Sequence, residues 1–273
     1  MKILFVGDVF GSAGRRIVRE HLPHVRESHQ IDLTVINGEN AAGGFGITPS
    51  LAEELFDLGA DVITTGNHVW DKKELIEYIK SVPETSHERA RRVLRPANLQ
   101  HGLPGHGVYE GVIEDGANIG TPYAVINIMG RVFMNGTNDP FNKIDRILEG
   151  IGQTSKAKII FVDFHAEATS EKVAMGWYLD GRVTAVLGTH THIPTADERV
   201  LPGGTAYQTD VGMSGPYDSV IGVEKELVLN RFLTGMSGKF EAATGNPKMC
   251  AAVISCDAMT GRAHRIQRLM LGE

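Results

Sequence analysis

Two histidines, His190 and His192, stand one residue apart directly after the apolar run 183–187. Alternate residues of an extended chain point to the same side, so both imidazole rings can face a single site. Neutral imidazole is the commonest side-chain metal ligand. This segment is therefore a candidate metal site, although paired histidines at the edge of a strand can also be purely structural.

Further side chains of metal-binding type follow other apolar runs that have the character of buried strands. They are Asp8, Glu39, Asn40, Asn67, His68 and His165. In open α/β sheets, function collects at the carboxyl ends of the strands, so we expect these groups to meet there. A mixture of carboxylate, amide and imidazole suits borderline divalent metals such as manganese, iron or zinc. Taken singly, each residue could instead be a helix cap, a turn residue or a buried core histidine.

The elements that would position these side chains alternate along the first two-thirds of the 273 residues, which predicts an α/β fold. Apolar runs predict strands at 3–6, 33–36, 62–65, 123–129, 159–164 and 183–187. Amphipathic stretches predict helices at 13–27, 49–58, 72–80, 142–148 and 170–179. From residue 195 onward, strand-like runs at 206–210, 251–256 and 263–269 predict antiparallel strands that complete a second sheet. We expect one domain over residues 1–273, with a small mobile lid within 200–245.

Composition excludes several classes of function. Hydrophobic residues make up 42% of the chain and charged residues 22%, which is typical of a globular protein. A net charge of −6 argues against a general nucleic-acid surface, because phosphate backbones require a positive field. No apolar run reaches membrane-spanning length, and Cys250 and Cys256 are interpreted as reduced thiols. We expect a cytoplasmic protein with a small-molecule substrate and no membrane partner, and a homo-oligomer is compatible with the sequence.

The order of the motifs resembles that of the calcineurin-like metallophosphoesterases over most of the chain. The matching segments are Gly7–Asp8, Gly38–Glu39–Asn40, Gly66–Asn67–His68, His165 and the run 188–192. Three departures stand out: Phe10 replaces a histidine, the second motif reads Glu39–Asn40, and Val69 replaces an acid. With the segments 7–15 and 209–213, these departures resemble the bacterial YmdB-like branch, which consists of cytoplasmic phosphodiesterases acting on 2′,3′-cyclic nucleotides. The resemblance implies a two-sheet β-sandwich flanked by helices, the αββα fold.

The resemblance also implies a role for each candidate residue. Glu39 would bridge two metal ions; Asp8, Asn40 and His192 would complete one site, and Asn67, His165 and His190 the other. Asn40 would offset the histidine that is missing at Phe10. Two ions ~3.5–4 Å apart activate a hydroxide and stabilise both ends of an in-line displacement at phosphorus. Iron or manganese is expected, with zinc as the alternative.

One histidine is expected to be catalytic without binding metal. His68 would stabilise the transferring group and protonate the leaving oxygen, which is worth roughly 10²–10⁴-fold in rate. The expected reaction is the hydrolysis of 2′,3′-cyclic nucleotides to 3′-nucleotides. Two alternatives stay open: a phosphomonoesterase or nucleotidase on the same site, and a metal- and nucleotide-binding regulatory protein with incidental turnover. A non-ligand acid favours an enzyme, because a sensor has no use for one.

The sequence says less about how a substrate is held. Arg15 or Arg16 could contact phosphate, and a surface role for both is an equal alternative. The sequence near the motifs contains no aromatic cluster that would predict a tight base pocket. Base identity is therefore expected to matter little. Phe10 and Phe45 are the aromatic candidates there.

Overall fold

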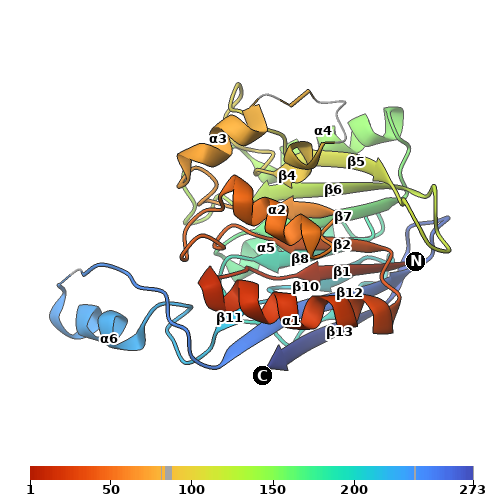
Figure 1. Cartoon of the computed structure of the whole chain (residues 1–273). Coiled ribbons are helices and arrows are strands. Elements are labelled where there is room, and N and C mark those ends of the chain that lie inside the picture. The colour runs from red at the N-terminus through yellow and green to blue at the C-terminus, as the bar shows by residue number, and fades with distance from the viewer. Residues whose placement is uncertain (81, 84–87, 237, 273) are drawn as a thin grey trace.

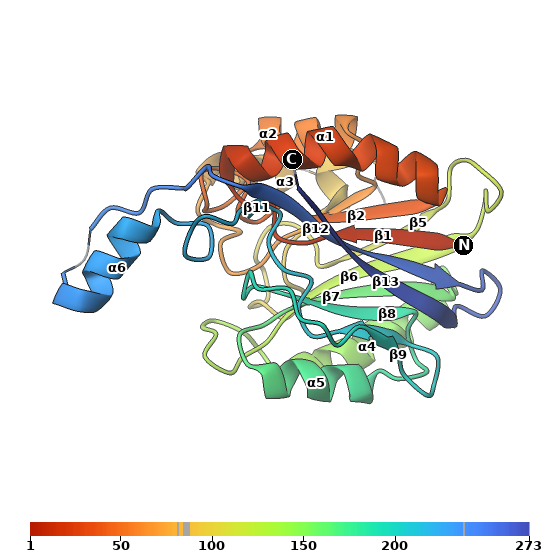
Figure 2. The same ribbon diagram turned by 90° about the horizontal axis from the view of Figure 1, so that it is seen from below.

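A computed structural model of the chain (Figure 1) describes residues 1–80, 82–83, 88–236 and 238–272. Two β-sheets pack face to face, and helices cover the outer face of each sheet, as the view in Figure 2 shows. The first sheet has the order β11-β12-β1-β2-β3-β4, with β13 paired to β12. The second has the order β5-β6-β7-β8-β10-β9. The expected two-sheet sandwich flanked by helices is confirmed.

The first sheet carries α1, α2 and α3 on its outer face (Figure 2). Its strands are β1 (Lys2–Val6), β2 (Leu33–Asn37), β3 (Val62–Thr64), β4 (Val93–Leu94), β11 (Gly215–Pro216), β12 (Pro247–Cys256) and β13 (Ala263–Gly272). The helices are α1 (Gly11–His29), α2 (Pro49–Asp57) and α3 (Lys73–Lys80), and a 3-10 turn spans Arg89–Arg92. Side chains of β1 alternate between two cores: Leu4 and Val6 pack under the helices, and Ile3 and Phe5 face the other sheet.

The second sheet carries α4 (Pro140–Gln153) and α5 (Thr169–Tyr178) on its own outer face (Figure 2). Its strands are β5 (Val108–Val112), β6 (Pro122–Met129), β7 (Ile159–His165), β8 (Ala185–Thr189), β9 (Arg199–Val200) and β10 (Ala206–Gln208). The Phe5 and Phe161 rings meet between the sheets with their centroids 4.9 Å apart. This shared apolar layer fixes the two sheets against each other, and so fixes the edge at which their strands end.

The C-terminal strands differ from the sequence-based expectation. β12 and β13 form an antiparallel hairpin that joins the first sheet beside β1. β10 instead lies parallel to β8 in the second sheet. An apolar pattern shows that a strand is buried but does not identify its pairing partner, which is why the sequence did not assign these strands to the correct sheets. None of the described helices is long and apolar enough to cross a membrane.

One segment leaves the body of the molecule. Residues 217–236 and 238–246, here called the arm, carry α6 (Lys225–Thr234), which projects to the left in Figures 1 and 2. At its base, Val223 and Val228 pack with Phe10 and Met213 in a small separate core. Further out, apolar side chains are 54% to 84% exposed at i, i+3, i+4 and i+7; they are Leu229, Phe232, Leu233 and Met236. This helix was not expected from the sequence.

Candidate metal centre

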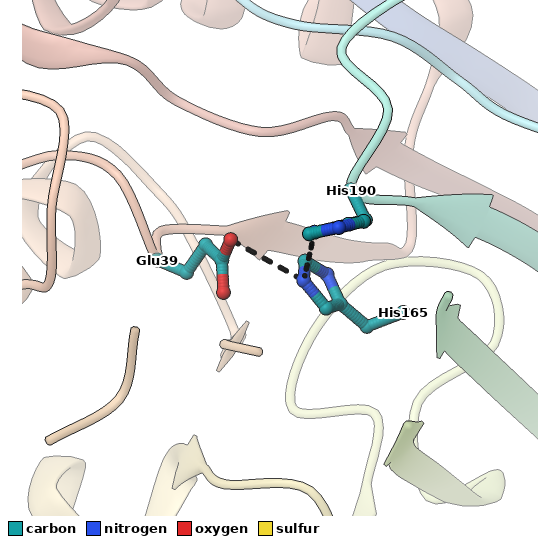
Figure 3. Close-up of side chains that lie close together, drawn as sticks. All are labelled: Glu39, His165 and His190. Atoms are coloured by element: carbon teal, nitrogen blue, oxygen red, sulfur yellow. Dashed lines mark hydrogen bonds and ion pairs between the residues drawn. The ribbon is translucent and has the colours of Figure 1, made fainter. Parts of the chain in front are cut away.

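The carboxyl ends of strands from both sheets meet at one edge of the molecule. β1, β2 and β3 run parallel in one sheet, and β7 and β8 run parallel in the other. Glu39 follows β2, His165 ends β7 and His190 follows β8. Their side chains point toward one another (Figure 3), and one ligand atom from each lies within 4.8 Å of the others. The structure thus brings together three of the seven expected ligands as a compact group.

One ring nitrogen lies at the centre of this group. His165 Nε2 lies 3.3 Å from Glu39 Oε1 and 3.0 Å from His190 Nδ1. Asn67 Oδ1 is 2.9 Å from the same nitrogen, which adds a fourth expected ligand. A carboxylate, an amide oxygen and two imidazoles therefore converge, which is a donor set suited to a borderline divalent cation.

A buried hydroxyl fixes the tautomer of His165. Thr189 Oγ1 donates its only hydrogen to Asp163 Oδ1 over 2.7 Å. The same oxygen lies 2.9 Å from His165 Nδ1 and must therefore accept the hydrogen bond from that nitrogen. When the ring is neutral, Nδ1 carries the hydrogen and Nε2 presents its lone pair to the group. Supporting hydrogen bonds of this kind orient histidines that bind metals.

The pKa shifts in the group show that its carboxylates stabilise a positive charge. Burial acts to raise the pKa of Glu39, but the adjacent His165 outweighs it and holds that pKa at about 2. Burial acts to lower the pKa of His165, but Glu39 and Asp8 outweigh it and raise that pKa to about 9. Burial and the charge of His165 together lower the pKa of His190 to about 3. The carboxylates thus draw one positive charge to the centre of the group, which is the place a cation would take.

Two of the remaining expected ligands have buried oxygens that accept no hydrogen bond within the described residues. Asp8 Oδ1 and Asn40 Oδ1 are buried and have no hydrogen-bond partner within the described part of the chain. Buried polar atoms are normally satisfied, so two such oxygens fit ligands for a cation. His192 Nδ1 lies 2.8 Å from the Ile221 carbonyl oxygen. Because that oxygen can only accept, Nδ1 carries the hydrogen and Nε2 is left with the lone pair. The residues present fit a second cation site, and its assignment stays a prediction.

The spacing of the two histidines predicted an extended chain after β8. The structure shows turns there instead. His190 has φ 96° and His192 has φ 67°, which is the left-handed region that residues other than glycine seldom adopt. The chain turns at both residues, and both rings still line the same cavity. Strained backbone of this kind concentrates at functional sites.

A buried ion pair holds this turn in place. Lys172 Nζ, on α5, lies 2.5 Å from Asp210 Oδ2 and donates to the Thr189 carbonyl oxygen at 2.7 Å. Asp210 Oδ2 also accepts from the Thr191 hydroxyl at 2.8 Å. Asp210 belongs to the segment 209–213 noted in the sequence, but nothing in the pattern indicated Lys172 as its partner, since a lysine on an amphipathic helix is usually solvated.

A missing side chain makes room for the group. A Cβ atom at Gly66 would stand 2.2 Å from Glu39 Oε2 and 2.3 Å from His165 Nε2. No real contact is that short, so only glycine permits the chain after β3 to approach these two ligands.

His68 lies beside the group rather than in it. Its Nδ1 is 2.9 Å from Asp71 Oδ2, and the residue lines the cavity. An acid at Nδ1 orients the ring so that Nε2 is the other available nitrogen. Asp71 was missed by the sequence analysis, and its signal was an acid three residues after the histidine in a turn.

A cavity of about 310 Å³ opens over these residues. Its polar lining includes Glu39, His68 and His190, and its apolar lining consists of Phe10, Phe45, Ile221, Val223 and Phe240. Phe240 belongs to the arm and had no sequence signal, because it is far along the chain from every motif. Arg15 is engaged elsewhere: it donates to the Ala41 carbonyl oxygen and does not line this cavity.

Phe10, which replaces a histidine of the wider pattern, is a packing residue. It is only 3% exposed, and a Cβ atom at Gly44 or Gly222 would lie 2.7 Å from its ring. Its ring meets His192 edge-on at a centroid distance of 5.5 Å. The ring therefore joins the loop after β2 to the arm.

Comparisons with known proteins agree with this architecture. The model of the YmdB-like protein family matches residues 4–269. The 2′,3′-cyclic-nucleotide 2′-phosphodiesterase of Bacillus subtilis (strain 168) is 46% identical over 100% of this chain and 98% of its own. The crystal structure of a hypothetical protein from Thermus thermophilus has a TM-score of 0.88 at 42% identity and covers 100% of both chains. A Mycoplasma pneumoniae crystal structure, described as a novel phosphatase, has a TM-score of 0.88 at 33% identity, over 100% of this chain and 93% of its own. The chain therefore belongs to the YmdB-like protein family.

Proposed function

We propose that this protein is a metal-dependent phosphodiesterase that hydrolyses 2′,3′-cyclic nucleotides to 3′-nucleotides. The observation that carries the proposal is the convergence of Glu39, His165 and His190 beside a histidine that is outside the group. The substrate class is supported by the B. subtilis relative, whose name specifies a 2′,3′-cyclic nucleotide. A cavity of about 310 Å³ lies at the lower end of the ~300–1,000 Å³ usual for small ligands, which suits a mononucleotide.

The metal ligands that we propose divide into two sets joined by Glu39. One set comprises Asp8, Asn40 and His192, and the other comprises Asn67, His165 and His190. Divalent ions held there would lower the pKa of a water molecule and neutralise charge on the phosphoryl group. We propose iron or manganese, with zinc as the alternative; elemental analysis of protein purified without added chelator identifies the ions.

The residue that we assign to proton transfer is His68. As water adds to phosphorus, the bond to O2′ breaks, and His68 Nε2 delivers a proton to the departing O2′. The proton released by the water leaves to solvent, and His68 is reprotonated before the next turnover. Asp71, at 2.9 Å from Nδ1, would keep the ring in this orientation.

A phosphomonoesterase on the same site is the second candidate, because the M. pneumoniae structure is described as a phosphatase. The deciding experiment supplies the metal-loaded protein with 2′,3′-cyclic AMP, 3′-AMP and a linear diester in parallel, and separates the products by chromatography. We expect 3′-AMP as the product. Exclusive formation of 2′-AMP, or faster hydrolysis of the monoester than of the cyclic diester, would remove the substrate assignment.

We further propose a single domain over residues 1–273, with the arm as its lid over the cavity. Support comes from Ile221, Val223 and Phe240, which belong to the arm and line the cavity.

Cys250 and Cys256 are both buried and free, which supports a reducing compartment and a cytoplasmic location.

We also propose that the protein is a homo-oligomer. The exposed apolar side chains of α6 support this, because a contiguous apolar face on a projecting helix is costly in water. The occupant that we propose for this face is a second copy of the chain.

A further inference from the structure

The apolar lining of the cavity includes two partly exposed aromatic rings that no metal chemistry requires. Phe45 lies in the loop after β2, and Phe240 lies on the arm. Their ring centroids are 6.2 Å apart at an interplanar angle of 57°, so they form one continuous aromatic surface. The two residues are far apart in the sequence and meet only in the folded chain.

This surface stands next to the reacting groups. The Phe45 ring meets His68 edge-on at a centroid distance of 5.0 Å. A ligand whose phosphate reaches Glu39 and His190 therefore extends its other end along the aromatic surface, because the same cavity contains all of these residues. In a mononucleotide, the end away from the 2′,3′-phosphate is the base.

The position of Phe240 is supported on the arm. Arg231 of α6 places its guanidinium carbon 5.6 Å from the Phe240 ring centroid, which is a cation–π contact. Phe240 is 43% exposed, so part of its ring is still available to a ligand. Phe10, by contrast, is packed between glycines and is not available.

We propose that Phe45 and Phe240 form a stacking site for the nucleobase of the substrate. The inference rests on the proposed function for the position of the phosphate. Stacking tolerates any base, because every base has a π face. The side chains of Phe45 and Phe240 offer no hydrogen-bonding groups to read base edges. The site would therefore accept both purines and pyrimidines, and purines more tightly through their larger area. The proposed site agrees with the sequence-based expectation that base identity matters little. It differs in placing the base against two aromatic rings.

The first test compares two cyclic diesters, 2′,3′-cyclic AMP and glycerol 1,2-cyclic phosphate, which has no base. In Phe240→Ala, we expect KM for the nucleotide to rise about 5- to 150-fold, the range that loss of base–aromatic stacking produces. KM for the base-free diester and kcat for both should stay at the parent values. Phe240→Trp should retain the parent KM for the nucleotide, and Phe45→Ala should raise that KM as Phe240→Ala does.

Trp177→Ala is the matched control. Trp177 is also an exposed aromatic residue, at 51%, and the guanidinium carbon of Arg199 lies 5.6 Å from its ring centroid. It lies on α5 and does not line the cavity. Its loss should leave both KM values unchanged.

A second measurement separates this inference from the proposed function. Calorimetric titration with adenosine 3′-phosphate and with glycerol phosphate needs no turnover. If Phe240→Ala weakens only the adenosine ligand, the stacking site stands even when the cyclic diester is not hydrolysed. Equal affinity of parent and Phe240→Ala for adenosine 3′-phosphate, or equal KM changes on both diesters, would overturn the inference.

Discussion

The group of ligands at the strand ends and the arm are built in opposite ways. The side chains of Glu39 and His165 are at most 1% exposed, and strands of two sheets support them. The arm places apolar side chains up to 84% exposed on a helix that projects from the body (Figure 1). Both regions nevertheless line one cavity. The comparison teaches that a rigid ligand group and a projecting segment contribute to the same cavity, so changes on the arm are expected to alter what the cavity holds more than the ligand group itself.

The largest effect is expected at the centre of the ligand group. Glu39→Gln removes the carboxylate charge that draws a cation, and we expect loss of both ions and of several kcal/mol of transition-state stabilisation, at least about 10³-fold in kcat. Elemental analysis and steady-state kinetics check this. Glu149→Gln, on an exposed position of α4, is the control and should change neither quantity. Two ions bound as in the parent would contradict the bridging assignment.

The next effect separates an acid from a ligand. His68→Ala should keep both ions and lose about 10²–10⁴-fold in kcat on substrates with poor leaving groups. On aryl phosphates, whose leaving oxygen needs little protonation, the loss should be much smaller. Asp71→Asn should fall between parent and His68→Ala. Equal losses on both substrate classes, or loss of one ion, would count against the assignment.

A smaller effect tests the support of the ligand group. Thr189→Val removes the oxygen that accepts from His165 Nδ1, and we expect metal affinity to weaken about 10- to 100-fold. Thr189→Ser keeps the hydroxyl and serves as the matched control. Titration of metal into the stripped proteins gives the dissociation constants. Equal affinities in Val and Ser variants would show that the hydroxyl does not set the tautomer.

Removal of metal should distinguish the two ligand sets. Each proposed set contains one amide oxygen, which is a weaker donor than imidazole, but the Asp8 side has one imidazole where the other side has two. The ion on the Asp8 side should therefore leave first. We expect a chelator titration to show two steps, with the first at lower chelator concentration in Asn40→Ala. A single step that is unchanged in this variant would refute the difference between the sites.

The smallest kinetic effect is expected on the outer face of the arm. Replacing Phe232 and Leu233 by serine should reduce the mass measured by light scattering while kcat on a base-free diester and metal content stay unchanged. A parent protein that is already monomeric, or a variant with the parent's mass, would contradict the homo-oligomer.

The strand ends were predictable from sequence because each one shows a local signal. An apolar run followed by a residue such as Asp8 or His165 marks both a strand and the place where its carboxyl end lies. Parallel order then brings such residues together. What the sequence could not show was the turn at His190 and His192, since positive φ at a histidine has no local signature.

The arm was not predictable for a related reason. The helix does carry an apolar period at Leu229, Phe232 and Leu233, but such a period predicts a buried face, and here that face is exposed. Phe240 meets Phe45 only through the course of the chain between them. The same holds for Lys172 and Asp210, whose pairing is a consequence of the packing of α5 on the second sheet. The sequence predicted most helices and strands, but it did not predict which distant segments contact one another.

Gly66 has a consequence for reading other sequences of this family. One methyl group there would stand 2.2 Å from Glu39 Oε2 and fill the space that the ligands surround, without altering any charge or any strand. The fold does not depend on that space, whereas the chemistry does. A relative with alanine at this position would therefore be expected to be a pseudoenzyme, with the sandwich intact and the metal centre sterically closed. One small residue outside the ligand set is thus expected to decide whether a relative can keep the metal centre.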